Sequence, residues 1–279
     1  MLKIRFSRIL FVGVLSFLLI GPSYLVAQDF MKGKNVLVFT KNGEGFVHDN
    51  VDVSARAIVD IGKKHGFNVE ITDDAAAFNE GKLKTLHLVV FANTNNEVFD
   101  NDQQRLDFRR FIQAGGGMVG IHSALGTERK WTWFNQLKGG TFVYHPIRQD
   151  LYLTKIVNHP STQELPTDWE WYDECYFSDV YYPGIQSLIV SHLDKLNEND
   201  QPAIAKHKTS FGDLHPVVWH QKFDGGTLWM TTLGHEKSAY TDPVFLTHLL
   251  GGLEYVASQV EKLDYTKASA KAHDEEVRY

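Results

Sequence analysis

Residues 115–124 read Gly-Gly-Gly-Met-Val-Gly-Ile-His-Ser-Ala, which places a helix end, a short apolar strand and a turn in succession. Small residues around such a turn let the chain bend sharply, as in the strand–turn–helix motif called a nucleophile elbow. An elbow projects one side chain above the carboxyl edge of a sheet, and in this sequence that residue is His122. An isolated core histidine would not need a strained bend, so the motif favours a functional role for His122.

Short apolar runs around the elbow indicate strands that are covered on both faces, as in a parallel sheet. We expect strands at residues 35–40, 68–72, 86–92 and 117–121, and helices at 54–65 and 102–114. This order of strands and helices predicts an α/β fold with a doubly wound, mostly parallel sheet of the flavodoxin-like type. In such sheets, ligands bind in the crevice at the carboxyl ends of the strands.

From Trp131 onward, aromatic residues crowd a stretch with little periodicity, which we interpret as an aromatic-rich insertion. Further strands are expected at residues 187–192, 203–208, 217–223 and 227–233. The turn Phe223-Asp224-Gly225-Gly226 predicts that the last two of these strands form a β-hairpin. A broad apolar face over residues 243–258 predicts that a helix closes the fold.

The first residues of the chain have the pattern of a targeting segment. Three basic residues precede an apolar run over residues 9–20, and the small residue Ala27 follows. This pattern predicts a secretory signal peptide over residues 1–27, cleaved after Ala27. The run of 12 apolar residues is too short for a membrane-spanning helix, which needs about 20. We therefore expect a periplasmic or secreted protein without stable membrane insertion.

We divide the rest of the chain into a linker over residues 28–34, one domain over 35–260 and a tail over 261–279. The tail is charged and poor in apolar residues, so we expect it to be disordered. The chain has 28 Lys and Arg residues against 34 Asp and Glu residues, which argues against nucleic-acid partners. The single cysteine, Cys175, excludes an internal disulfide, and the oligomeric state stays open.

Three histidines, His48, His122 and His235, follow predicted strands and are expected on one rim of the sheet. Imidazole nitrogen and carboxylate oxygen bind divalent transition metals such as zinc, and imidazole also transfers protons near neutral pH. We interpret these three histidines as candidate metal ligands. The candidate catalytic residues are His122, His235, Glu174 and Asp173. The alternative is that each histidine has only a structural role.

Six further residues are candidate substrate-binding groups, because they follow the third strand or lie in the aromatic stretch. They are Asn93, Thr94, Trp131, Trp133, His145 and Tyr176. Tryptophans beside acidic residues and histidine suit stacking against the faces of a sugar. The alternative is that the aromatic residues pack in the core.

Three other classes of protein are excluded by particular residues. A cysteine hydrolase or glutamine amidotransferase needs a thiol at the elbow, and Cys175 lies far from it. Ser123 follows the projecting position, so a serine-hydrolase triad has no well-placed nucleophile. Gly115-Gly116-Gly117 precedes a strand rather than a helix, so it is not a phosphate loop and no nucleotide cofactor is expected.

The order of several short motifs resembles that of the ThuA-like (trehalose utilisation) family, which has the class I glutamine amidotransferase-like fold. The resemblance covers about residues 35–257. Its motifs are Gly45-Phe46-Val47-His48-Asp49, Phe91-Ala92-Asn93-Thr94, the stretch 115–124, Trp131 with Trp133, Phe142 with His145-Pro146, His159-Pro160, Asp173-Glu174-Cys175-Tyr176, Pro216 with Trp219, Leu233-Gly234-His235 and Asp242-Pro243. One departure is Cys175, where family members more often carry a bulkier residue.

The resemblance implies that His122 takes the place of the amidotransferase cysteine and that His235 lies near the position of that triad's histidine. It also implies a role in sugar metabolism, in which the protein acts on oxidised (3-keto) glycosides. We therefore expect an exported enzyme that acts on a small glycoside or 3-keto-glycoside by metal-assisted or histidine acid–base hydrolysis or elimination, with isomerisation as the next choice. The alternative is a non-catalytic carbohydrate-binding module that uses the same crevice.

Overall fold

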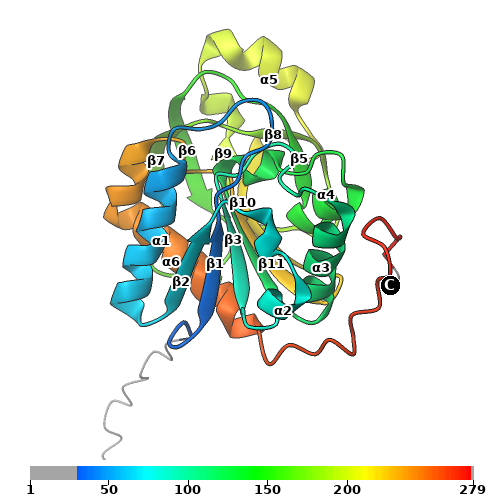
Figure 1. Cartoon of the computed structure of the whole chain (residues 1–279). Coiled ribbons are helices and arrows are strands. Elements are labelled where there is room, and N and C mark those ends of the chain that lie inside the picture. Colours follow the sequence, from blue (N-terminus) through cyan, green and yellow to red (C-terminus); the bar gives the residue numbers. More distant parts are fainter. Residues whose placement is uncertain (1–29, 278–279) are drawn as a thin grey trace, which may run out of the picture.

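A nine-stranded sheet forms the centre of the computed structural model, which describes residues 30–277 (Figure 1). The predicted signal peptide and cleavage site lie outside the described residues. The order of the strands in the sheet is β2-β1-β3-β4-β11-β10-β9-β6-β7. The strands are β1 (Asn35–Phe39), β2 (Asn68–Thr72), β3 (Leu88–Ala92), β4 (Gly117–Ile121), β6 (Gln149–Lys155), β7 (Asp168–Asp173), β9 (Gln186–His192), β10 (Leu214–Phe223) and β11 (Gly226–Thr231).

One half of the sheet is parallel and the other half antiparallel. Strands β2, β1, β3, β4 and β11 pair in parallel, while β10, β9, β6 and β7 continue the sheet in antiparallel pairs. Strands β5 (Gly140–Tyr144) and β8 (Phe177–Tyr181) form a separate antiparallel pair. The predicted α/β fold built on a doubly wound parallel sheet is confirmed, and the antiparallel strands extend this sheet at one edge.

Helices cover both faces of the parallel half (Figure 1). On one face, α1 (Val51–His65) and α6 (Pro243–Gln259) bury a core of aliphatic residues. On the other face, α2 (Glu80–Leu83), α3 (Asp102–Gln113) and α4 (Thr132–Lys138) pack on a core rich in phenylalanine. Helix α6 comes so close to β4 that a Cβ on Gly117 would lie 2.3 Å from Val256 Cγ1. Position 117 therefore has room only for glycine.

The hairpin predicted at residues 223–226 joins β10 and β11, with Phe223 opposite Gly226. Its two central residues have positive φ angles, 46° at Asp224 and 95° at Gly225. This is the requirement of a type I′ turn, whose twist matches that of the strands. The hairpin therefore returns the chain to the sheet beside β4, and β11 ends at the same edge as the elbow.

The strand expected at residues 203–208 is wrong, because this segment is the helix α5 (Gln201–His207). Proline in the first turn of a helix already has the required φ and lacks an N–H that would be unpaired there. Of the residues in α5, only Ile204 is buried, so this segment lacks the buried apolar face that a strand of the sheet would have. The aromatic insertion, which shows little periodicity, holds α4 and the strands β5, β6, β7 and β8.

The tail, expected to be disordered, instead runs along α3 as far as residue 277 (Figure 1). Arg110 of α3 donates hydrogen bonds to the carbonyls of Ala268 and Ala270 at 2.9 and 3.1 Å. The side chain of Gln113 accepts a hydrogen bond from the Ala270 N–H at 2.9 Å. These bonds engage the backbone of the tail, so its charged composition did not indicate them.

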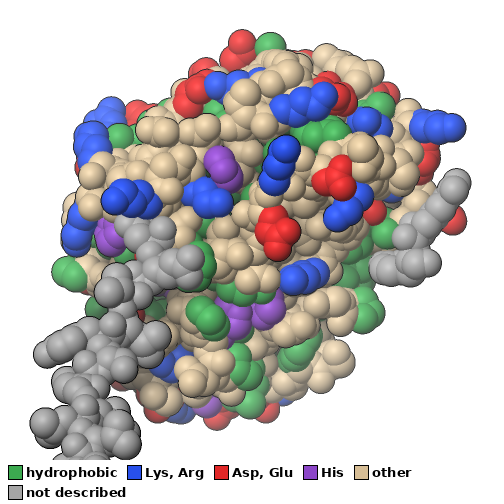
Figure 2. All heavy atoms as spheres, turned by 90° about the horizontal axis from the view of Figure 1, so that it is seen from below, with side chains coloured by type: hydrophobic (Ala, Val, Ile, Leu, Met, Phe, Trp, Pro, Cys, Tyr) green, Lys and Arg blue, Asp and Glu red, His purple; other side chains and the backbone are tan. Residues whose placement is uncertain are grey.

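The two ends of the parallel strands differ in character. Seen from below, where β1 begins, the molecule shows Lys, Arg, Asp and Glu side chains interspersed with apolar ones (Figure 2). A cluster of three histidines and one glutamate lies at the other edge of the sheet, where these strands end. Within residues 30–277, no helix has the length and the apolar character needed to cross a membrane.

Candidate metal centre

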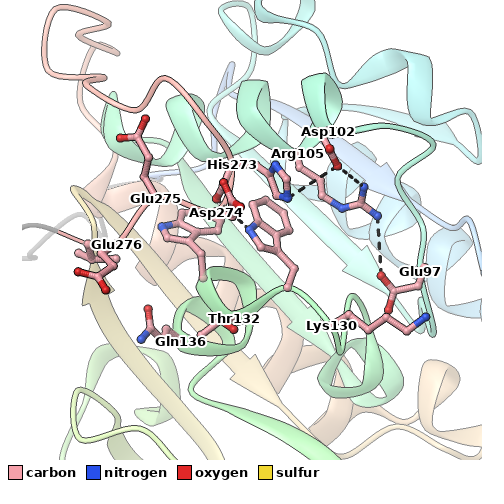
Figure 3. Close-up of a pocket in the computed structure, with 13 residues that line it drawn as sticks. Glu97, Asp102, Arg105, Lys130, Thr132, Gln136, His273, Asp274, Glu275 and Glu276 are labelled. Atoms are coloured by element: carbon pink, nitrogen blue, oxygen red, sulfur yellow. Dashed lines mark hydrogen bonds and ion pairs between the residues drawn. The ribbon is translucent and has the colours of Figure 1, made fainter.

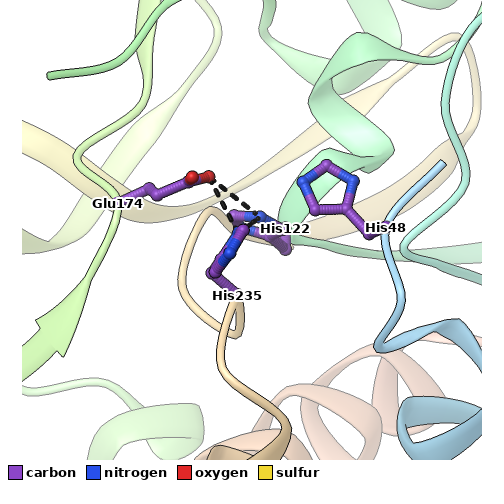
Figure 4. A group of neighbouring side chains, drawn as sticks. All are labelled: His48, His122, Glu174 and His235. Carbon is purple, nitrogen blue, oxygen red and sulfur yellow. Dashed lines mark hydrogen bonds and ion pairs between the residues drawn. The ribbon is translucent and has the colours of Figure 1, made fainter. Parts of the chain in front are cut away.

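Four segments that are far apart in the sequence bring three imidazoles and one carboxylate together (Figure 4). His48 lies in the loop after β1, His122 directly after β4 and His235 after β11, while Glu174 directly follows β7. One donor atom from each residue lies within 4.8 Å of the donor atoms of the other three. The convergence of the three histidines expected at this rim is therefore observed, and Glu174 belongs to the same group.

Three of the donor atoms already have the spacing of metal ligands. His122 Nε2 lies 3.3 Å from His235 Nδ1, and Glu174 Oε2 lies 3.0 Å from His235 Nδ1 and 3.5 Å from His122 Nε2. Tetrahedral zinc with bonds of about 2.0–2.1 Å separates its ligand atoms by about 3.3–3.4 Å. Glu174 Oε2 is buried and has no well-aligned hydrogen bond in the structure. The donor set and its spacing therefore fit a divalent metal ion.

The elbow fixes His122 in the form that a metal ligand requires. Its φ angle of 50° is rare for a residue with a side chain and confirms the expected strain. His122 Nδ1 lies 2.8 Å from the Thr232 carbonyl, which only accepts hydrogen bonds, so Nδ1 carries the hydrogen and Nε2 the lone pair. Beyond the elbow, the side-chain nitrogen of the buried Lys138 donates to the carbonyls of Leu125 and Thr127 at 2.8 and 2.6 Å and holds the turn.

Asp173 positions the loop that carries His235. The buried carboxylate of Asp173 accepts backbone N–H groups of Gly234 at 2.7 Å, His235 at 3.1 Å and Glu174 at 2.8 Å. It also accepts a hydrogen bond from Trp171 Nε1 at 2.9 Å. The Asp173 oxygens are therefore engaged by three backbone N–H groups and one indole N–H, and they do not join the cluster. Asp173 is thus a positioning residue for Glu174 and His235.

Burial and mutual charge set the protonation of the cluster. Burial, together with the neighbouring His122 and His235, lowers the pKa of His48 to about 3. Burial alone would raise the pKa of Glu174, but contacts with His122 and His235 outweigh it and lower this pKa. Burial opposes charge on His235 as well, yet Glu174 raises the pKa of this imidazole above its usual value. Near neutral pH, His48 is neutral and Glu174 is ionised, while the raised pKa of His235 favours its protonated form.

We expect the affinity of the cluster for Zn²⁺ to rise with pH. A bound metal must displace the proton of His235, because only the neutral imidazole is a ligand. Below the raised pKa of His235, the affinity should therefore gain about tenfold per pH unit, and above it the affinity should level off. Zn²⁺ titrations between pH 5 and 8 measure this slope. An affinity that is constant across that range would contradict the assignment of His235 as a ligand.

A cavity of about 520 Å³ opens beside the cluster. Of the residues expected to bind substrate, His145 and Tyr176 line it, together with the cluster members His48 and Glu174. The Tyr176 hydroxyl lies 3.0 Å from His122 Nε2 and 3.2 Å from His48 Nε2, so it reaches the cluster directly. Burial raises the pKa of Tyr176 well above its usual value, which keeps the phenol protonated and able to donate.

Four expected substrate-binding residues do not line this cavity. The Asn93 side-chain amide donates to the Tyr240 hydroxyl at 2.7 Å, and the Thr94 hydroxyl bonds that of Thr127. Trp131 and Trp133 are buried, stack on each other and line a different cavity of about 730 Å³ (Figure 3). This second cavity lies between α4 and the tail, where Trp131 Nε1 donates to the His273 carbonyl.

Sequence reasoning missed seven residues that line the cavity beside the cluster. They are Phe46, Asn95, Asn96, Ser123, Gly126, Arg129 and Phe142. Phe46 and Phe142 lie within motifs that carry the family resemblance. Their place in the sequence next to His48 and His145 could therefore have indicated that they line the cavity. Asn95, Asn96 and Arg129 have no such signal, because their meeting depends on how the loops after β3 and β4 pack together.

The fold and the site define a flavodoxin-like α/β protein with a histidine–carboxylate centre at the carboxyl edge of its parallel strands. A family model described as ThuA, trehalose utilisation, matches residues 35–256. The chain therefore belongs to the ThuA family. A search of curated proteins gives no match.

Solved structures of similar fold include two ThuA-like proteins. A putative ThuA-like protein from Bacteroides uniformis ATCC 8492 superposes with a TM-score of 0.67 at 21% identity, covering 83% of this chain and 94% of that one. A putative ThuA-like protein from Parabacteroides merdae ATCC 43184 gives a TM-score of 0.63 at 20% identity, covering 81% and 91%. At this identity the comparison shows the shared fold alone.

Proposed function

We propose that this ThuA-family protein is a metal-dependent enzyme that cleaves a glycoside or 3-keto-glycoside by hydrolysis or elimination. The observation that carries the proposal is the set of three donor atoms, from His122, His235 and Glu174, spaced 3.0–3.5 Å apart. The adjoining cavity of about 520 Å³ falls within the range of small-molecule sites, which is about 300–1,000 Å³. The family description, trehalose utilisation, supports a sugar as the ligand.

The chain's own residues suit removal of a proton next to a polarised carbonyl. His122, His235 and Glu174 would hold the metal, with His48 as a further ligand. A divalent metal bound there supplies Lewis-acid polarisation of a sugar carbonyl or lowers the pKa of a water. His145 Nδ1 lies 2.8 Å from the Pro146 carbonyl and therefore donates to it, which leaves the lone pair on Nε2.

In a 3-keto-glycoside, the ketone acidifies the proton on carbon 2. His145 Nε2 accepts this proton, and the electron pair of the C–H bond forms a double bond between carbons 1 and 2 as the glycosidic C–O bond breaks. The leaving oxygen takes up a proton, so the products are an unsaturated keto-sugar and an alcohol. The Tyr176 hydroxyl, which reaches the cluster, donates a hydrogen bond to a substrate oxygen there.

Metal analysis followed by a sugar screen tests the proposal. We expect the purified protein to contain a divalent metal and to convert 3-keto-trehalose faster than trehalose, with loss of turnover in a chelator. His145→Gln should lower kcat by about 10²–10⁴-fold, the usual contribution of a proton-transfer group, while metal content is unchanged. Sugar binding without turnover, insensitive to chelator, would instead support the non-catalytic carbohydrate-binding module.

Export to the periplasm or the medium is part of the same proposal. It is supported by the basic residues, the apolar run over residues 9–20 and the small residue Ala27 at the start of the chain. Cell fractionation with amino-terminal sequencing tests it, and a mature protein that begins at Gln28 is the expected result. A protein that keeps its leader and stays in the cytoplasmic fraction would contradict export.

A further inference from the structure

Arg129 differs from the other arginines that the structure describes. Each of the other five lies within 4.0 Å of a carboxylate: Arg56 with Asp52, Arg105 with Glu128, Arg109 with Asp224, Arg110 with Glu80, and Arg148 with Glu236. Among residues 30–277, Arg129 alone of the arginines has no such ion pair. It is solvent-exposed, and it lines the cavity beside the metal centre. Among the described residues, no carboxylate within 4.0 Å therefore pairs with this positive charge at the place where a substrate would bind.

The guanidinium of Arg129 is held in one place. Its Nη2 donates to Asn95 Oδ1 at 3.0 Å, and the group lies 5.6 Å from the centre of the Phe142 ring. The backbone carbonyl of Arg129 accepts a hydrogen bond from Asn135 Nδ2 at 2.8 Å. A Cβ on Gly126 would lie 2.8 Å from Arg129 Nη2 and 2.5 Å from Asn95 Oδ1. Glycine at position 126 therefore leaves the space that this arginine and its amide partner occupy.

A second polar group in the same cavity lacks a partner. Ser123 follows His122 on the elbow, is only 2% exposed and lines the cavity. Its hydroxyl oxygen has no hydrogen-bond partner in the structure. A buried hydroxyl without a partner is costly, and an oxygen of a bound ligand would satisfy it.

The carboxylate that lines the cavity does not neutralise Arg129. Glu174 contacts His122 at 3.5 Å and His235 at 3.0 Å, and its charge is engaged there. A divalent metal on the same residues would add further positive charge. The cavity therefore suits a ligand that brings a negative charge of its own, and an arginine recognises carboxylate or phosphate through two parallel hydrogen bonds.

We propose that Arg129, with Ser123, binds an anionic group on the sugar, so that the substrate is an acidic glycoside carrying a carboxylate or a phosphate. This inference rests on the proposed function, because it takes the same cavity as the place where the sugar binds. It narrows the substrate class from glycosides and 3-keto-glycosides in general to those that carry a negative charge. Arg129 is then the residue that determines specificity, at a distance from the proton-transfer step.

Calorimetric binding of three matched sugars to the zinc-loaded protein tests the proposal. Methyl β-D-glucuronide carries a carboxylate where methyl β-D-glucoside carries a neutral hydroxymethyl group, and methyl β-D-glucoside 6-phosphate carries a phosphate there. We expect one of the two charged sugars to bind about 10–100-fold more tightly than the glucoside, as a charge-assisted pair would give. The tighter of the two identifies the anionic group as carboxylate or phosphate.

Arg129→Gln should remove this preference while metal content stays the same. Gly126→Ala should weaken it as well, because the new methyl group displaces the guanidinium without removing its charge. Lys130→Gln is the matched control, because it removes the charge of the next residue in the same loop. Lys130 lines the other cavity, so this variant should keep the preference. Equal binding of all three sugars, or an unchanged preference in Arg129→Gln, would overturn the proposal.

The measurement separates this inference from the proposed function. In His122→Asn, which should lose turnover, the preference for a charged sugar should persist, because Arg129 and Ser123 remain in place. A wild-type protein that prefers charged sugars but turns over none of them would support the anion site and contradict the enzyme. Turnover of 3-keto-trehalose without any preference for charged sugars would support the enzyme and contradict the anion site.

Discussion

His122→Asn is expected to lower the affinity for Zn²⁺ by at least about 100-fold and to abolish turnover, with the fold retained. Loss of a group that merely orients a metal ligand already costs about 10–100-fold in affinity. His122 supplies Nε2 itself, which lies 3.3 Å from His235 Nδ1 at the centre of the cluster. Asparagine is the suitable replacement because it tolerates the positive φ of 50° better than most residues with a side chain.

Metal content by mass spectrometry, zinc titration and turnover of 3-keto-trehalose measure the effect of this substitution. His65→Ala, at the end of α1 and away from the cluster, is the matched control and should bind metal like the wild type. Thermal unfolding of the metal-free proteins separates a lost ligand from a lost fold. A folded His122→Asn protein with wild-type zinc affinity would refute the metal centre as described.

Asp173→Ala is expected to lower the free energy of unfolding by about 3–5 kcal/mol and to impair metal binding with it. The carboxylate accepts four N–H groups, from Trp171, Glu174, Gly234 and His235. Each buried donor left without a partner costs about 1–3 kcal/mol, and water that enters the gap recovers part of the sum. The loop that presents His235 would lose the bonds that position it.

Urea unfolding of the metal-free protein measures the loss as a lower midpoint with an unchanged slope. Asp168→Ala, at the other end of β7 and exposed, should stay within about 0.5 kcal/mol of the wild type. Asp173→Asn keeps the shape and one acceptor oxygen, so it should fold better than the alanine variant and still bind zinc more weakly than the wild type. An Asp173→Ala protein as stable as the wild type would show that these four bonds are replaceable.

The parallel half of the fold could be predicted because its signals are local. The apolar strand at residues 117–121 needs no partner to be recognised, and the glycines before it mark the end of a helix. The rule that parallel strands end at one edge then brings His48, His122 and His235 together without any knowledge of distances. The sequence predicts a carboxylate beside these histidines, because carboxylates accompany histidine at metal sites, but it does not distinguish Glu174 from Asp173.

The rest of the site depends on packing that a sequence does not display. Trp131 and Trp133 look like a sugar platform, yet the phenylalanine-rich core and the tail bury both of them. The antiparallel strands β6 and β7 have few fully buried residues, so they lack the continuous apolar runs that mark the parallel strands in the sequence. Among residues 30–277, Arg129 forms no ion pair with a carboxylate, and no spacing of residues in the sequence could indicate this.

The tail along α3 is held through its peptide groups, since Arg109 and Arg110 both donate to its carbonyls. Every amino acid offers such a carbonyl, so the exposed side chains of this segment can vary while its path is kept, whereas the buried Ala268 and Ala270 leave no room for larger residues. Deletions, in contrast, would withdraw acceptors from the buried Arg109 and the half-buried Arg110. Protein engineers who look for a place to add labels can therefore exchange exposed residues in this segment more safely than they can shorten it.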